Sequence, residues 1–259
     1  MRSPSKSLLK MAYLLSAVAA STGVASAQTD QPAPAARPEA PKGEKVAQFW
    51  AQRESGYVTT RDGTKLAYTV LLPEGPGPFP VILNYTGYDP SALGGPAYRR
   101  GDTAMSIDLD GELVEQGYAV AGLNSRGTGC SQGIFDFADL SFGPDGADAV
   151  EFLAKRPWSN GKVGMNQLSW AGLSQLLTAA ERPPSLRAIA PGMASADSRD
   201  AGAPGGVPQM LMRLGWWQFV STRWTNVEED AKVRGDQECL LQVAVNRKVA
   251  NRQSPTTIA

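Results

Sequence analysis

The sequence of 259 residues contains no histidine, only two cysteines and no excess of either charge. Without histidine or clustered cysteines, a transition-metal site is not expected. Twenty-five acidic residues balance twenty-five basic ones, and no basic stripe is visible, so neither nucleic acid nor an anionic membrane surface is expected as a partner. No apolar run reaches the roughly 20 uncharged residues of a transmembrane helix. The sequence therefore predicts no integral membrane segment.

The two cysteines are Cys130 and Cys239. They could pair in an oxidising compartment, but two cysteines make neither a disulfide framework nor a metal-binding spacing. We therefore favour two separate buried thiols over a disulfide.

The amino-terminal 27 residues have the layout of a secretory signal peptide. Basic residues come first, an apolar stretch follows over 11–20, and the small-residue triplet Ala25-Ser26-Ala27 ends the pattern. Cleavage is expected between Ala27 and Gln28, which predicts a secreted or periplasmic protein. Residues 28–45 are rich in proline and alanine and predict an unstructured linker.

Strand and helix signals alternate along the rest of the chain, beginning with two β-rich runs that flank Asp62-Gly63 and predict a hairpin. The later strands are expected around 81–84, 117–124, 162–170 and 186–193, and the helices around 144–155 and 171–180. Such alternation predicts an α/β fold with a mostly parallel sheet covered by helices on both faces.

The segment "NQLSWAG" places Ser169 between a predicted strand and a predicted helix. A nucleophile elbow has this order, because the sharp turn exposes the hydroxyl beside the N–H groups of the helix start. Gly172 follows the serine by three residues, but Gln167 stands two residues before it, where a small residue is typical. Taken alone, the segment is also compatible with an ordinary helix cap.

A second glycine-rich segment, "RGTGCSQG", follows the strand predicted over 117–124. Its glycines, Gly127, Gly129 and Gly133, are spaced one residue too widely for a dinucleotide-binding turn, and no helix signal follows. We expect no cofactor, and interpret the segment as a tight surface loop in which Arg126 ties neighbouring segments together.

Several stretches in order resemble the α/β-hydrolases that include Xaa-Pro dipeptidyl-peptidases, cocaine esterase and α-amino-acid ester hydrolases. They are "TRDGTKLA", "YDP", "GYAVAGLNSRGTGCSQG", "RPWSNGKVGM", the serine turn and "AIAPGMASAD". The resemblance implies that Ser169 is the nucleophile, that the Trp170 N–H and the Tyr88 hydroxyl stabilise an oxyanion, and that Gln167 replaces a family glycine. It also implies hydrolysis of a small-molecule ester or peptide through a serine acyl-enzyme.

The resemblance further implies an incomplete α/β-hydrolase core over 46–200 and the start of a helical cap over 201–259. Four aromatic residues in the second region could line an acyl pocket, although packing in a helical core is the simpler interpretation: Trp216, Trp217, Phe219 and Trp224.

Serine hydrolases of this fold carry their triad in the order Ser, Asp, His, and this chain has no histidine. The resemblance places the acid and the histidine beyond the cap, so we expect a truncated product with little or no activity. Lys162 is not a convincing substitute base, because it lies before the strand that leads to Ser169. A secreted binding protein that keeps a degenerate hydrolase core is the alternative.

Overall fold

A computed structural model describes residues 50–96, 107–135, 141–194, 207, 215–216 and 225–253. The chain divides into two units, Met1–Glu39 and Ala40–Ala259, and all described residues belong to the second. The expected signal peptide and linker, residues 1–45, lie outside the described residues.

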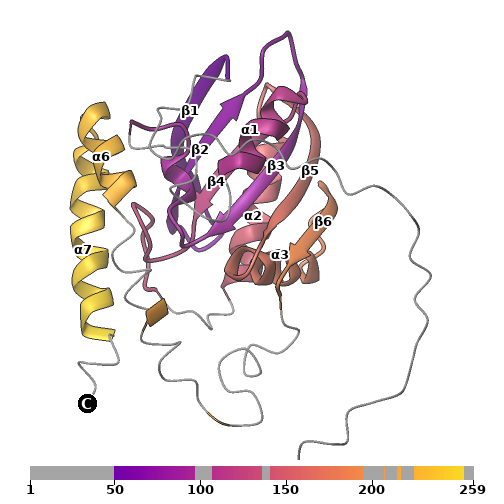
Figure 1. Cartoon of the computed structure of the whole chain (residues 1–259). Helices are drawn as coiled ribbons and strands as arrows, with labels where there is room; N and C mark the ends of the chain where they lie inside the picture. Colours follow the sequence, from indigo (N-terminus) through magenta and orange to yellow (C-terminus); the bar gives the residue numbers. More distant parts are fainter. Residues whose placement is uncertain are drawn as a thin grey trace, which may run out of the picture. The chain divides into compact units, whose positions relative to one another are not determined.

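A six-stranded sheet forms the centre of this unit, in the order β1-β2-β4-β3-β5-β6 (Figure 1). Strands β1 and β2 are antiparallel and β2 is antiparallel to β4, whereas β4, β3, β5 and β6 run parallel. The strands are β1 (Gln52–Thr59), β2 (Lys65–Leu72), β3 (Phe79–Thr86), β4 (Ala119–Asn124), β5 (Ser159–Leu168) and β6 (Leu186–Gly192). The predicted Asp62-Gly63 hairpin is confirmed, because β1 pairs with β2 across it.

The helices cover both faces of the sheet, as predicted. On β2 and β4 the side chains of Leu71 and Val120 pack with Val114 of α1 (Ile107–Glu115) on one face. The residues adjacent to Leu71 and Val120 in sequence point to the other face. There they join the main core with α2 (Phe142–Ala154) and α3 (Trp170–Ala180). This separation follows from the alternation of side chains along a strand. The mostly parallel α/β core predicted from the sequence is therefore confirmed.

Two further helices, α6 (Thr225–Arg234) and α7 (Gln237–Gln253), belong to the region predicted to begin a helical cap. Both pack against the core. The Arg53 guanidinium of β1 makes a two-pronged ion pair with Asp230 of α6, with both N–O distances at 2.9 Å. The Asn246 amide of α7 donates to the carbonyl oxygens of Gly129 and Ser131 at 2.9 and 2.8 Å.

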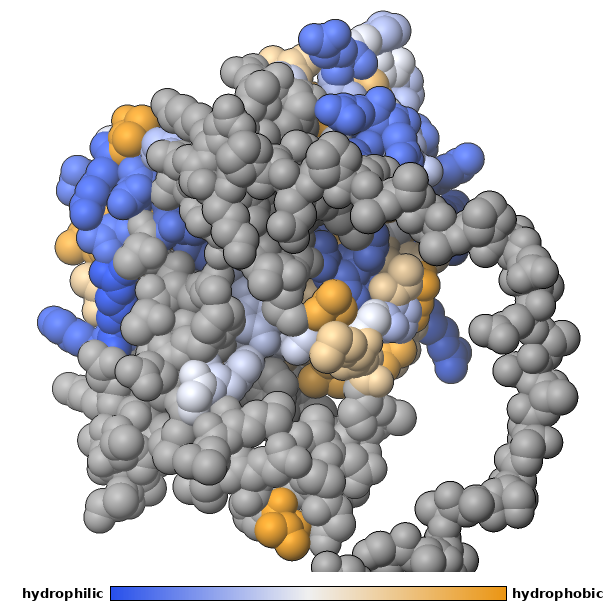
Figure 2. Space-filling view, in the orientation of Figure 1, coloured by the Kyte–Doolittle hydropathy of each residue, from blue (hydrophilic) through white to orange (hydrophobic). Residues whose placement is uncertain are grey.

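Strand β6 ends the sheet within the described part of the chain. Ala188 and Ala190 on it are exposed, and Met193 just after it is 81% exposed. In the hydropathy view, apolar residues gather over β6 and α3, whereas hydrophilic and apolar residues are mixed elsewhere (Figure 2). Among the helices that the structure describes, none combines the length and the apolar composition needed to cross a membrane.

Candidate active site

Ser169 lies in the sharp turn between β5 and α3, as the sequence predicts. Its backbone has φ 62° and ψ −124°, a conformation that non-glycine residues rarely adopt. Its side chain makes no capping hydrogen bond to the helix that follows, which argues against the ordinary helix-cap interpretation. A strained serine between a parallel strand and a helix is the geometry of a nucleophile elbow.

Gln167, two residues before the serine, also has a positive φ, 148°. A glycine would adopt this conformation with less strain, so glutamine in place of the family glycine makes the backbone of the turn more strained. The Gln175 side chain of α3 holds the turn: its amide donates to the carbonyl oxygens of Gln167 and Ala171, both at 2.9 Å. Its own carbonyl accepts from the Ala190 N–H of β6 at 2.9 Å.

Gly172 allows α3 to begin close to β6. A side chain at this position would collide with the carbonyl oxygen of Gly192. The same carbonyl oxygen accepts a hydrogen bond from the Ser169 N–H at 2.9 Å. The glycine three residues after the serine therefore reflects a close approach of two backbones at the elbow.

Trp170 begins α3, so its N–H lies at the positive end of the helix dipole. Its ring is 2% exposed and lies within an aromatic cluster at the carboxyl end of the parallel strands. Ring-centre distances from Trp170 are 5.3 Å to Tyr88, 5.3 Å to Phe135, 5.4 Å to Trp216 and 6.0 Å to Phe142. A side chain at Gly87 would collide with this ring. The cluster fixes the residue that follows the serine.

Tyr88 lies on the loop after β3 and packs its ring edge-to-face on Trp170. Its hydroxyl oxygen accepts a hydrogen bond from Trp216 Nε1 at 2.7 Å. Tyr85, near the end of β3, is buried in the core. The structure thus brings Tyr88, on the loop after β3, against the turn that carries Ser169 and Trp170, while the roles of these residues in an oxyanion site stay predictions.

Asp89 connects the Tyr88 loop to α6. It has a left-handed backbone, with φ 72°, and its carboxylate is buried. Its Oδ2 accepts from the Val227 N–H in the first turn of α6 at 3.1 Å. A carboxylate is favourable there because of the N–H groups and the dipole at a helix start.

The loop after β4 is buried rather than on the surface, which corrects the sequence interpretation. Thr128 and Ser131 are inaccessible to solvent because α7 lies over them. A disulfide joins Cys130 of this loop to Cys239 of α7, so the expectation of two separate thiols was wrong. Both cysteines were correctly expected to be buried.

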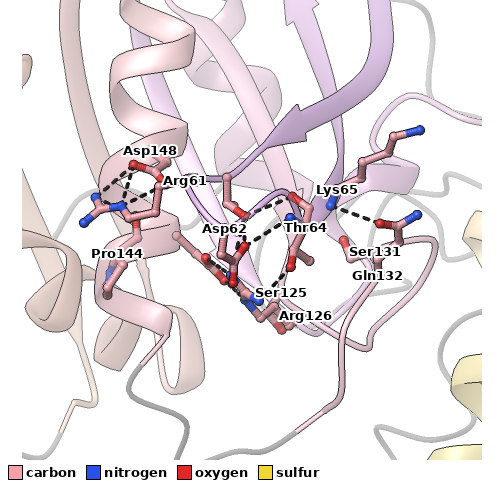
Figure 3. A network of polar contacts seen from close by, with 12 residues as sticks. Arg61, Asp62, Thr64, Lys65, Ser125, Arg126, Ser131, Gln132, Pro144 and Asp148 are labelled. Atoms are coloured by element: carbon pink, nitrogen blue, oxygen red, sulfur yellow. Dashed lines mark hydrogen bonds and ion pairs between the residues drawn. The ribbon is translucent and has the colours of Figure 1, made fainter.

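Arg126 ties this loop to its neighbours, as predicted. It forms ion pairs with Asp62 of the hairpin at 2.8 Å and with Asp145 of α2, and donates to Thr64 at 2.8 Å (Figure 3). Hydrogen bonding to Asp145 raises the pKa of Arg126. Burial raises the pKa of the Asp145 carboxyl, although Arg126 opposes this shift. The network joins the hairpin, the β4 loop and α2.

Among the four aromatic residues considered for an acyl pocket, Trp216 packs against the main core, as the simpler interpretation expected, and its Nε1 also donates to the Tyr88 hydroxyl. Trp217, Phe219 and Trp224 lie outside the described residues. Lys162 lies in the first half of β5, away from the serine end, as expected.

The sequence interpretation missed Gln175 and the docking role of Asp89, since neither has a local signature. Within the described ranges, no group of His, Cys, Asp and Glu side chains could hold a metal ion.

Comparison with known proteins identifies relatives of the chain. The chain is 31% identical over 206 residues to cocaine esterase from Rhodococcus sp. (strain MB1 Bresler), covering 78% of this chain and 34% of that protein. The crystal structure of a CocE/NonD family hydrolase from Staphylococcus aureus superposes with a TM-score of 0.57 at 27% identity. That match covers 72% of this chain and 36% of the other. The chain therefore spans about a third of the length of these relatives.

Residues 62–257, most of the chain, match the X-Pro dipeptidyl-peptidase family S15. With the strand order, the elbow and the relatives above, this match shows that the chain belongs to that family.

Proposed function

We propose that the chain provides the nucleophile and the oxyanion site of a serine hydrolase that cleaves a small-molecule ester or peptide bond. The observation that carries the proposal is the backbone of Ser169, φ 62° and ψ −124°, in the turn from β5 to α3. Such strain persists only where the surroundings hold it, and it costs about 1–3 kcal/mol. Gln175 and the backbone of β6 supply that support.

In the proposed reaction, Ser169 Oγ attacks the carbonyl carbon and loses its proton to a base, and the carbonyl oxygen becomes an oxyanion. The Trp170 N–H and the Tyr88 hydroxyl donate to that oxyanion. Collapse of the intermediate breaks the ester or amide bond, and the protonated base gives its proton to the departing alcohol or amine. Water then attacks the acyl-enzyme, which releases the acid and restores the Ser169 hydroxyl. These 259 residues contain no histidine, so the imidazole of a usual triad is not among them.

The substrate class follows from the relatives. One relative is named an esterase, and the family is described by dipeptidyl-peptidase activity, so both ester and amide bonds fit the proposal.

We also propose that the protein is exported. The signal-peptide pattern of residues 1–27 supports this. The Cys130–Cys239 disulfide supports it independently, because disulfides persist in oxidising compartments. Amino-terminal sequencing of protein secreted from a bacterial host should begin at Gln28, and protein retained with an intact terminus in the cytosol would contradict export.

The catalytic proposal is tested by mass spectrometry of the complete gene product after reaction with a fluorophosphonate. The expected result is a single adduct on Ser169 and its loss in Ser169→Ala. Ser185→Ala is the matched control, since Ser185 lies just before β6 at the opposite end of the sheet and pairs with Glu151. An adduct that persists in Ser169→Ala, or hydrolysis that survives this substitution, refutes the nucleophile.

A second candidate is a binding protein without catalysis. The absence of histidine from these residues favours it. Binding of an ester without its turnover by the complete gene product, together with no fluorophosphonate adduct, would identify this second function.

A further inference from the structure

Trp216 contacts the candidate oxyanion residue directly, although 128 residues separate it from Tyr88. Its ring lies 6.5 Å from the Tyr88 ring at 81° and 5.4 Å from the Trp170 ring at 59°. Its Nε1 atom lies 2.7 Å from the Tyr88 hydroxyl oxygen, the distance of a short hydrogen bond. The three rings therefore touch one another pairwise.

The chemistry of the two groups fixes the direction of this bond. An indole N–H can only donate, whereas a phenol oxygen accepts and its own proton donates. Trp216 must therefore donate to Tyr88, and the hydroxyl proton of Tyr88 is not used in this bond. A hydrogen bond received by an oxygen also polarises its O–H bond and makes it a stronger donor.

We infer that Trp216 is a positioning residue, which holds the Tyr88 hydroxyl so that its proton is donated to the oxyanion formed at Ser169. The inference rests on the proposed function, because it assigns a partner to the proposed oxyanion donor. The indole ring fills space, but a phenylalanine ring would fill most of it. The N–H group is what a packing role alone does not require.

A double-mutant cycle in the complete gene product separates positioning from packing. Trp216→Phe keeps a ring against Trp170 and removes only the donor. We expect kcat to fall about threefold to tenfold with little change in KM, the usual cost of one neutral hydrogen bond. In a Tyr88→Phe background the same substitution should change kcat less than twofold. An equal loss in both backgrounds refutes the inference.

Trp158→Phe is the matched control. It also removes an indole donor, which in this case bonds to Glu54 Oε2 at 2.9 Å on the hairpin side of the sheet. It should leave kcat unchanged. A loss of kcat equal to that of Trp216→Phe would show a general effect of indole removal and overturn the inference.

A second measurement, by NMR spectroscopy, does not depend on enzymatic activity. In the 259-residue chain, the indole N–H resonance that Trp216→Phe removes should shift upfield in Tyr88→Phe and stay in place in Trp158→Phe. An unchanged resonance in Tyr88→Phe refutes the hydrogen bond. A failure of the proposed function would be detected separately, as hydrolysis that survives Ser169→Ala. It would not change the NMR spectrum, so the two failures can be distinguished.

Discussion

The Asp89 carboxylate accepts a hydrogen bond from the Val227 N–H at 3.1 Å, and so joins the loop after β3 to the first turn of α6. Asp89 follows Tyr88 directly, and its left-handed backbone turns the chain into the short 3-10 helix η1 (Pro90–Ala92). The candidate oxyanion residue is therefore attached to a helix in which the bonded residue, Val227, lies 138 residues after Asp89.

Replacement of Asp89 by alanine should lower the free energy of unfolding of the chain by about 1–2 kcal/mol, the usual cost of a lost helix cap. Asp89→Asn keeps an acceptor oxygen and tolerates the left-handed backbone, so it should cost less. Urea unfolding followed by tryptophan fluorescence measures both. Equal losses in the two variants would show that the acceptor oxygen is unimportant.

Relief of the backbone strain at Gln167 should stabilise the chain, whereas the Asp89 substitutions should destabilise it. Gln167→Gly should raise the free energy of unfolding by about 1 kcal/mol, because glycine adopts a φ of 148° with little strain. The hydrogen bond from Gln175 is kept, since it ends on the backbone oxygen of residue 167.

The matched control is Gln167→Ala, which retains the Cβ atom and therefore the strain. Urea unfolding should show no gain for it. A Gly variant no more stable than the Ala variant would contradict strain at this position.

Local sequence patterns were sufficient for much of the fold. The Asp62-Gly63 turn, the buried run ending at Asn124 and the strand-serine-helix order around Ser169 each depend on neighbouring residues, and all were predicted correctly. The Cys130–Cys239 disulfide was not predicted, since it depends on how α7 docks over the β4 loop. The hydrogen bond from Trp216 to Tyr88 depends on tertiary structure in the same way, and no spacing in the sequence indicates it.

Glu54 should make stability depend on pH in the acid range. Burial alone would raise its pKa, but hydrogen bonds from Tyr68 and Trp158 and the charge of Arg156 outweigh burial and lower the pKa below the ordinary 4.5. The pKa of Glu54 is lower in the folded chain than in the unfolded chain, so the ionised carboxylate stabilises the fold. This stabilisation is complete at a pH above the unfolded-state pKa and is lost as the pH falls through the folded-state pKa.

Glu54→Gln should therefore destabilise the chain by roughly 1 kcal/mol at neutral pH, since Glu54 is partly exposed, and by less as the pH falls from about 5 to about 3. Urea unfolding of both proteins across this range provides the measurement. A difference that stays constant with pH would exclude the carboxylate as its source.

The disulfide closes a separation of 109 residues, so its reduction should lower the free energy of unfolding by about 3–5 kcal/mol. The chain has no other cysteine, and dithiothreitol therefore acts on this bond alone. The double variant Cys130→Ala, Cys239→Ala should be as unstable as the reduced protein and insensitive to dithiothreitol. Two free thiols in the unreduced, denatured protein would show that the bond does not form.

The 259 residues expressed alone should hydrolyse activated esters weakly and amides not at all. Ser169 lacks an imidazole to accept its proton near neutral pH, and the same group is missing when an amine leaving group must be protonated. Oxyanion donors and binding alone can still accelerate hydrolysis about a thousandfold to ten-thousandfold over water, so a slow reaction with p-nitrophenyl acetate is expected.

Purification from a host without interfering esterases, and assays with p-nitrophenyl acetate and an aminoacyl-proline amide, provide the measurement, with Ser169→Ala as the reference. The ester signal should fall in that variant, because Ser169 supplies the attacking oxygen. Efficient cleavage of the amide that depends on Ser169 would require a base within these residues. Lysine is then the residue type to examine, since a desolvated lysine can replace histidine as a base.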